Sequence, residues 1–188
     1  MQERPGSPTI PDVEQERLTG YLDALNAHGI AVDDALIGLG CYYEREGGGG
    51  TNDGHVWMRR FLDRAPRPTA VFAGSDLLAA GALQAIYERS LRVPDDVSVV
   101  GFDDTYAPYF APPLTTVEQP MVEMGKVAAA LVFRSLARTA GDVGERIVRV
   151  PTRLIVRAST GPAPGREITA SGSRASSGTL AMSSPTYR

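Results

Sequence analysis

The chain has 188 residues, of which 43% are hydrophobic and 22% charged, with a net charge of −3. It has room for one ordinary globular domain, or for one lobe and part of another. The acidic balance excludes the basic surface with which a chain grips nucleic acid by itself, and the single cysteine, Cys41, excludes an internal disulfide.

The first half of the chain predicts two helices around a short strand. Asp12 caps a helix whose apolar residues recur at helical spacing and which Gly29 ends. Gly20 costs this helix about 1 kcal/mol relative to alanine, so we expect another segment to pack closely against it. "ALIGLG" (35–40) predicts a short buried strand, and a glycine-rich loop then leads to a second helix at about residues 52–64.

From residue 69 onward the pattern alternates between strands and helices. "TAVFA" (69–73) predicts a strand, and Asp76 is a plausible N-cap for a helix that ends near Ser90. "VSVVGF" (97–102) predicts a strand buried on both faces, as parallel strands between two helix layers are. Elements at this spacing predict a parallel α/β sheet.

The last third of the chain is less regular. "PPLTTVEQP" (112–120) predicts a crossing segment, and a long helix follows at about residues 121–138. "RIVRV" and "RLIVR", on either side of Pro151, predict two short strands. The tail from Gly161 is rich in serine, glycine, alanine and proline, which predicts disorder.

Two acidic pairs flank the strand at residues 97–102. Ligands of an open parallel sheet lie beyond the carboxyl ends of its strands, and Asp103 and Asp104 stand at that end. A carboxylate there can accept hydrogen bonds from sugar hydroxyls, or it can merely cap the following loop; residue chemistry leaves both open. Asp95 and Asp96 precede the strand and predict a solvated turn.

Two more polar side chains each allow two interpretations, a contact with a ligand and a purely structural role. Ser75, in "GSD", follows the strand at residues 69–73 and could offer a hydroxyl to a ligand, although the triplet alone favours helix capping. Arg17 carries a planar fork of donors suited to vicinal hydroxyls or a carboxylate. Without other information it is more simply an exposed helix arginine.

Motifs of catalysis and metal binding are missing from the sequence. His28 and His55 lack the spacing of a metal site. No nucleophile elbow, phosphate-binding loop or dinucleotide-binding fingerprint occurs. We therefore expect no enzyme activity, no catalytic residue, no metal and no cofactor.

Localisation follows from the apolar runs. None reaches the length of a membrane span, and residues 1–15 lack the apolar core of a signal peptide. We expect a cytoplasmic protein without a membrane partner.

Four segments together resemble the effector-binding region of LacI/GalR-family transcriptional regulators, the relatives of the lactose and galactose repressors. They are "ERLTGYLDALNAHGI" (16–30), "RPTAVFAGSDLLAAGALQAIYERSLRVPDDVSVVGFDD" (67–104), "PPLTTVEQPMVEMGKVAAALV" (112–132) and "PTRLIVRAST" (151–160). The resemblance covers roughly residues 8–160. It implies a three-layer, parallel-sheet α/β fold like that of periplasmic binding proteins, with a small effector in the cleft between two lobes.

The resemblance also implies how the chain is divided. Its parts are an irregular N-terminus at 1–7, the C-terminal lobe at 8–118 and 151–160, part of the N-terminal lobe at 119–150, and a disordered tail at 161–188. Family members begin with a helix-turn-helix domain, which this sequence does not contain before Pro8. We therefore expect the C-terminal part of a regulator.

The resemblance implies six effector-binding residues: Arg17, Thr19, Tyr42, Ser75, Asp103 and Gln119. Arg17 and Asp103 would be the polar clamps, and Tyr42 the platform that stacks on a sugar ring. Ser75 stands where many members carry asparagine, so the identity of the effector is not to be borrowed from a relative. Ser75 and the other two residues would be weaker contacts.

These observations predict the effector-sensing portion of a LacI-type regulator. It would bind a small ligand, a carbohydrate, in an interlobe cleft, form a homodimer, and reach operator DNA only through a helix-turn-helix domain outside this chain. The alternative is a sugar-binding protein of a transport system, which uses the same fold; upstream coding sequence would distinguish the two. A third possibility is a non-functional remnant whose orphan helix exposes apolar surface.

Overall fold

The structure is a computed structural model that describes residues 13–39, 52–136 and 147–162. The predicted helix cap Asp12 and nearly all of the predicted tail lie outside these residues. Everything stated below concerns the described part of the chain.

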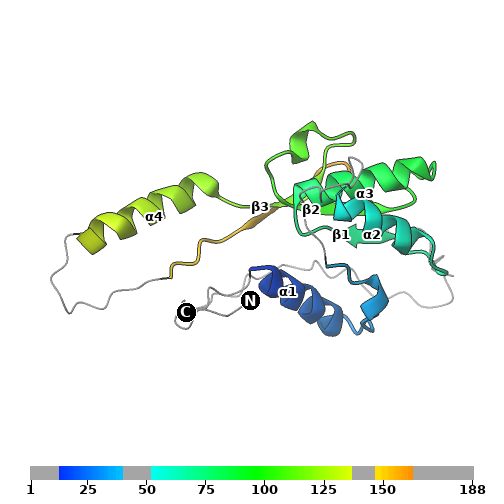
Figure 1. The fold of residues 1–188 in the computed structure, drawn as a ribbon, viewed down its shortest axis with the longest axis horizontal. Coiled ribbons are helices and arrows are strands. Elements are labelled where there is room, and N and C mark those ends of the chain that lie inside the picture. Colours follow the sequence, from blue (N-terminus) through cyan, green and yellow to red (C-terminus); the bar gives the residue numbers. More distant parts are fainter. Residues whose placement is uncertain (1–12, 40–51, 137–146, 163–188) are drawn as a thin grey trace, which may run out of the picture.

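A four-stranded sheet forms the centre of the molecule, with the spatial order β1-β2-β3-β4 (Figure 1). Its strands are β1 (Ala70–Phe72), β2 (Ser98–Asp103), β3 (Thr115–Glu118) and β4 (Arg153–Ile155). The first three are parallel, and β4 runs antiparallel to β3. The predicted parallel α/β sheet is confirmed.

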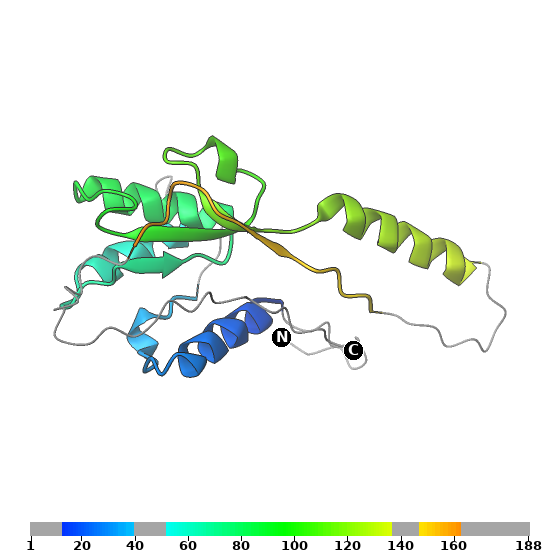
Figure 2. The same cartoon turned by 180° about the vertical axis from the view of Figure 1, so that it is seen from behind.

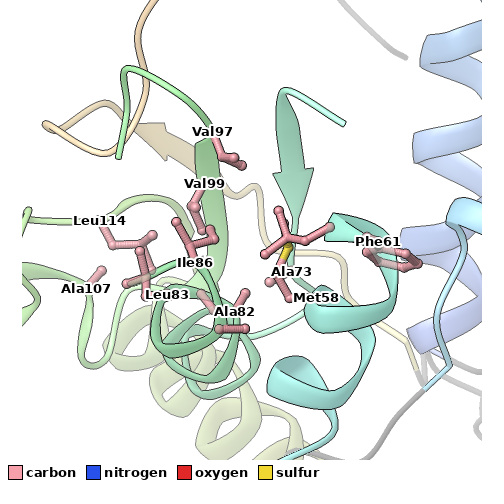
Figure 3. Packing of buried hydrophobic residues seen from close by; sticks show 13 residues of the cluster. Met58, Phe61, Ala73, Ala82, Leu83, Ile86, Val97, Val99, Ala107 and Leu114 are labelled. Atoms are coloured by element: carbon pink, nitrogen blue, oxygen red, sulfur yellow. The ribbon is translucent and has the colours of Figure 1, made fainter. Parts of the chain in front are cut away.

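Two predicted helices form the core with one face of this sheet. They are α2 (Asp53–Leu62) and α3 (Asp76–Glu88). In Figure 3 the apolar side chains of α3 lie near Val97 and Val99, and Met58 of α2 lies beside Ala73, which follows β1. Val97 and Val99 are fully buried there, whereas Val100 and Phe102, which alternate with them, are only half-buried. The expectation of a strand buried on both faces is therefore wrong, because only one face carries the core.

The start of α3 corrects a second expectation. Ser75, and not Asp76, is the N-cap: its backbone is extended, and its hydroxyl accepts a hydrogen bond of 3.1 Å from the Leu78 N–H. Asp76 is already helical, and its carboxylate turns away to other partners. The two candidate caps stand one residue apart, a difference that capping preferences do not resolve.

Helix α1 (Val13–Ala27) brings a half-buried apolar stripe and one arginine to the rest of the molecule. It ends as predicted at Gly29, whose φ is +65°. The Ile30 N–H bonds to the Leu25 carbonyl and the Gly29 N–H to the Asn26 carbonyl, a Schellman motif. The close packing expected at the mid-helix glycine, Gly20, is wrong, because a Cβ there would meet nothing within 4 Å.

Three segments differ from the strands and loops expected of them. Residues 35–39 form no strand; a 3-10 turn, η1 (Asp34–Leu36), stands at their start, and Leu39 is 76% exposed because no strand of the sheet lies beside it. The predicted crossing segment at 112–120 contains strand β3, since it pairs with β2. In "RIVRV", residues 147–150 are not a strand.

Helix α4 (Met121–Leu136) is the long helix predicted between β3 and β4. It projects away from the sheet, as Figures 1 and 2 show from opposite sides. None of its residues is buried, and Val122, Phe133 and Leu136 are more than two-thirds exposed. Its apolar stripe therefore has no partner among the described residues.

The segment at residues 157–161 completes the sheet after β4. Ser159 accepts from the Val99 N–H through its carbonyl, at 2.9 Å, and from the Thr115 N–H through its hydroxyl, at 2.8 Å. The Gly161 N–H donates to the Ser98 hydroxyl. These bonds fasten the end of the described chain to the beginnings of β2 and β3.

Candidate functional site at the carboxyl edge of the sheet

The carboxyl ends of the parallel strands bring three predicted site residues to one edge of the sheet. Ser75 follows β1 after Gly74, Asp103 ends β2, and Gln119 follows β3. The register pairs Asp103 with Glu118, directly before Gln119. This edge is where an open α/β sheet binds its ligands.

Asp103 holds the centre of this edge in an uncommon backbone conformation. Its φ is +110°, and the next residue, Asp104, has a φ of +58°. The side-chain amide of Gln119 donates to Asp103 Oδ1. Burial raises the pKa of Asp103, against the opposing effects of the Gln119 hydrogen bond and the positive charge of Arg17.

Arg17 reaches the same edge from α1, at the distant beginning of the chain. One terminal nitrogen donates to the Gly74 carbonyl at 2.8 Å, and the guanidinium lies 4.0 Å from the centre of the Phe102 ring. Its Nε is buried without a hydrogen-bond partner among the described residues. Stacking and one hydrogen bond thus fix this cation at the edge of the sheet.

The remaining predicted site residues stand differently. The buried Ser75 hydroxyl accepts from the backbone as the helix cap. Thr19 lies on the exposed side of α1, where its hydroxyl donates to the Gln15 carbonyl and not to the described residues at the edge. Tyr42 lies outside the described residues.

Asp76 is a residue of this edge whose role the sequence did not indicate. It is 1% exposed. One carboxylate oxygen accepts from three successive N–H groups, those of Thr105, Tyr106 and Ala107, at 2.9–3.1 Å. The other accepts from the Thr116 hydroxyl at 2.8 Å. Partners 29 to 40 residues away leave no local signal, so capping was the nearest local explanation.

Arg157 is a second such residue. Its Nη1 lies 2.7 Å from Asp104 Oδ1, and its guanidinium also donates to the Leu114 carbonyl. Both charged side chains are less than one-fifth exposed. Asp104 thus supports the loop after β2. A lone arginine after a short strand gives no hint in the sequence of a partner 53 residues away.

The chemistry of the edge is that of recognition. It combines a carboxylate, a guanidinium and an amide, which together can accept from and donate to the hydroxyls of a neutral polar ligand. Within the described ranges, no group of three or more His, Cys, Asp and Glu side chains could hold a metal ion. In the same ranges, no helix is both long and apolar enough to cross a membrane.

Comparisons with known proteins agree with this architecture. The model of the periplasmic binding protein-like domain matches residues 6–160. The HTH-type transcriptional repressor PurR of Mannheimia succiniciproducens is 35% identical over 146 residues, which cover 77% of this chain and 41% of the relative. The chain spans about two fifths of the length of the curated relatives it matches.

Solved structures extend the likeness to the fold. A complex of the transcriptional regulator CelR with cellobiose aligns with a TM-score of 0.68 at 38% identity, over 82% of this chain and 45% of that one. A LacI family transcriptional regulator from Lactobacillus casei with bound sucrose aligns with a TM-score of 0.63 at 29% identity, over 82% and 54%. The chain therefore belongs to the family of periplasmic binding protein-like domains, and its homologues are LacI-family transcriptional regulators.

Proposed function

We propose that this chain is the effector-sensing part of a LacI-type transcriptional regulator and that its effector is a carbohydrate. The ligand lies at the carboxyl edge of the sheet, in the cleft between the lobe that the sheet forms and a second lobe to which α4 belongs. The observation that carries this proposal is the convergence of Arg17 and Asp103 on that edge from opposite parts of the sequence.

The roles of the side chains follow from their chemistry. The Asp103 carboxylate accepts from two sugar hydroxyls, and the Arg17 guanidinium donates to a third. Gln119 donates from the crossing segment, and Ser75 and Thr19 are weaker contacts. Tyr42 stacks on the apolar face of the sugar ring. Related regulators with bound cellobiose and sucrose support a carbohydrate over other small ligands.

The signal passes through the segments that leave the sheet. β3 and β4 both connect to the region of α4, and Gln119, where β3 leaves the sheet toward α4, contacts Asp103. A ligand that prefers one arrangement of the lobes shifts the population toward it. The regulator acts as a cytoplasmic homodimer, without a membrane partner, and reaches operator DNA through its helix-turn-helix domain.

Isothermal titration of the full chain with a panel of sugars, beginning with cellobiose, tests the proposal. Replacing Asp103 by asparagine removes a charged acceptor at constant size, so we expect the affinity for a sugar that binds to fall about tenfold or more. Asp95→Asn is the matched control, because Asp95 is an exposed carboxylate before the same strand. Equal affinities of the Asp103→Asn variant and the wild type would overturn the site.

A further inference from the structure

The buried carboxylate of Asp76 joins four parts of the fold at the candidate site. A charged group with 1% exposure is costly unless hydrogen bonds replace its water. Asp76 meets this condition with three backbone N–H groups and one hydroxyl. It also stands in the first turn of α3, where the helix dipole favours a negative charge.

The strand that carries Asp103 passes directly beside this carboxylate. A Cβ on Gly101 would lie 2.7 Å from Asp76 Oδ1, so the backbone of β2 approaches as closely as only glycine permits. Thr116, on the neighbouring strand β3, donates to the same oxygen. Asp76 therefore touches β2 and β3 at once and holds the chain that follows β2.

The turn after β2 needs such a support. The positive φ values of Asp103 and Asp104 are unusual for residues with a side chain, and such a backbone conformation is energetically unfavourable. Such a conformation persists only where the surroundings enforce it. Asp76 binds the backbone of residues 105–107, beginning one residue after Asp104. Arg157, in contrast, contacts this turn through the side chain of Asp104 and not through its backbone.

We propose that Asp76 is the positioning residue of the site: by binding the backbone of residues 105–107, it fixes the turn that presents the Asp103 carboxylate to Gln119 and to the ligand. The ligand part of this inference rests on the proposed function. The orientation of Asp103 toward Gln119 does not, and it can be measured without any ligand.

Two variants of Asp76 in the full chain distinguish the effect of its hydrogen bonds on the turn from the effect of its negative charge. Asp76→Asn keeps an oxygen that accepts from the three N–H groups, and its amide can donate to the Thr116 hydroxyl, so the turn keeps its shape. Asp76→Ala removes all four hydrogen bonds. Ser159→Ala is the matched control, because it also removes buried hydrogen bonds to β2 and β3, but at their beginnings.

The first measurement is the position of the Gln119 side-chain amide signals in a 15N–1H NMR spectrum. Gln119→Leu assigns these signals, and Asp103→Ala gives their position without the hydrogen bond. We expect Asp76→Ala to move them to that position, and Asp76→Asn and Ser159→Ala to leave them near the wild-type position. Wild-type signals in the Asp76→Ala variant would overturn the proposal.

A milder variant covers the case in which Asp76→Ala shows no cooperative unfolding. Thr116→Val removes one of the four hydrogen bonds at nearly constant volume, so we expect the Gln119 signals to move part of the way. Signals that stay in place in this variant would then count against the proposal.

The second measurement is the affinity for cellobiose by isothermal titration. We expect Asp76→Ala to weaken binding about tenfold, and the Asp76→Ala, Asp103→Ala double variant to bind no more weakly than Asp103→Ala alone. Losses that multiply would show that Asp76 does not act through Asp103. If wild type does not bind cellobiose while the Gln119 signals move as expected, the ligand of the proposed function is wrong and the positioning of Asp103 stands.

Discussion

At the scale of single residues, His55 and Glu88 link the two helices of the core. His55 Nε2 lies 2.8 Å from Glu88 Oε2, and Gln84 donates to the other carboxylate oxygen. The hydrogen bond from His55 is the main reason why the pKa of Glu88 lies below its ordinary value. The fold therefore favours the charged form of Glu88.

This lowered pKa predicts a pH-dependent contribution to stability. A carboxyl group whose pKa is lower in the folded state stabilises the fold above its unfolded-state pKa, about 4.3 for glutamate, and loses this effect as the pH falls through the folded-state value. We expect Glu88→Gln to lower the thermal midpoint at pH 7, by a difference that shrinks between about pH 5 and pH 3. A difference that is the same at every pH would contradict this account.

A matched control for that prediction lies on α4. Glu123 pairs only loosely with Lys126, at 3.5 Å, and its side chain is 55% exposed. Glu123→Gln should therefore leave the midpoint nearly unchanged at both ends of the pH range.

Two arginines on the same segment should differ sharply in their effect on stability. Arg157 and Asp104 form a largely buried ion pair, whereas Arg153 is 71% exposed beside Glu118. Arg157→Met leaves the Asp104 charge without its partner and should lower the free energy of unfolding by about 1–3 kcal/mol. Arg153→Met should change it by less than about 0.5 kcal/mol. Urea denaturation distinguishes these outcomes, and equal effects would refute the distinction.

At the scale of elements, α1 contains two glycines with opposite expected responses to alanine. A Cβ at Gly29 or at Gly20 would meet no neighbouring segment within 4 Å. The effect of alanine on stability at each position therefore depends only on the backbone conformation there. Gly29→Ala places a side chain at φ +65° and should destabilise by about 1 kcal/mol. Gly20→Ala improves helix propensity and should stabilise by about 0.5–1 kcal/mol. Urea unfolding followed by circular dichroism measures both, and effects of the same sign would contradict the assignment.

The sequence predicted best the elements whose signals are local. The helices α1, α2, α3 and α4 follow from apolar spacing and from caps such as Gly29, and β1 and β2 from short apolar runs between turn residues. The turn with Asp95 and Asp96 is also confirmed, with Asp95 exposed and Asp96 bonded to Arg92. In each case the residues that define the element lie within a few positions of one another.

The predictions that failed concern features that depend on residues far apart in the sequence. Strand β3 exists because Thr115–Glu118 pairs with β2, and residues 35–39 form no strand because no strand of the described chain pairs with them. At the candidate site, the end of a predicted strand indicated the place of Asp103, and the family resemblance indicated that of Gln119. The roles of Asp76 and Arg157 depend on partners far along the chain, which a local pattern does not contain.

At the scale of the whole molecule, stability is concentrated on one side. The core lies between the sheet and the helices α2 and α3, whereas α4 carries its apolar residues exposed. Leu114→Ala opens a cavity at a residue with no exposure and should cost about 2–5 kcal/mol. Leu136→Ala, at 77% exposure, should cost less than about 0.5 kcal/mol. Thermal and urea unfolding of both variants tests this, and a comparable loss at Leu136 would show that α4 is packed in solution.

The hydrogen bonds of residues 157–161 have a consequence for how the protein is made. Ser159 supplies the partners of the Val99 and Thr115 N–H groups, both in buried residues, and buried N–H groups without partners are costly. When β2 and β3 emerge from the ribosome, these partners have not yet emerged. The hydrogen bonds at the beginnings of β2 and β3 can therefore all form only after residue 161 has emerged. Until then, the Val99 and Thr115 N–H groups of the nascent chain lack these partners.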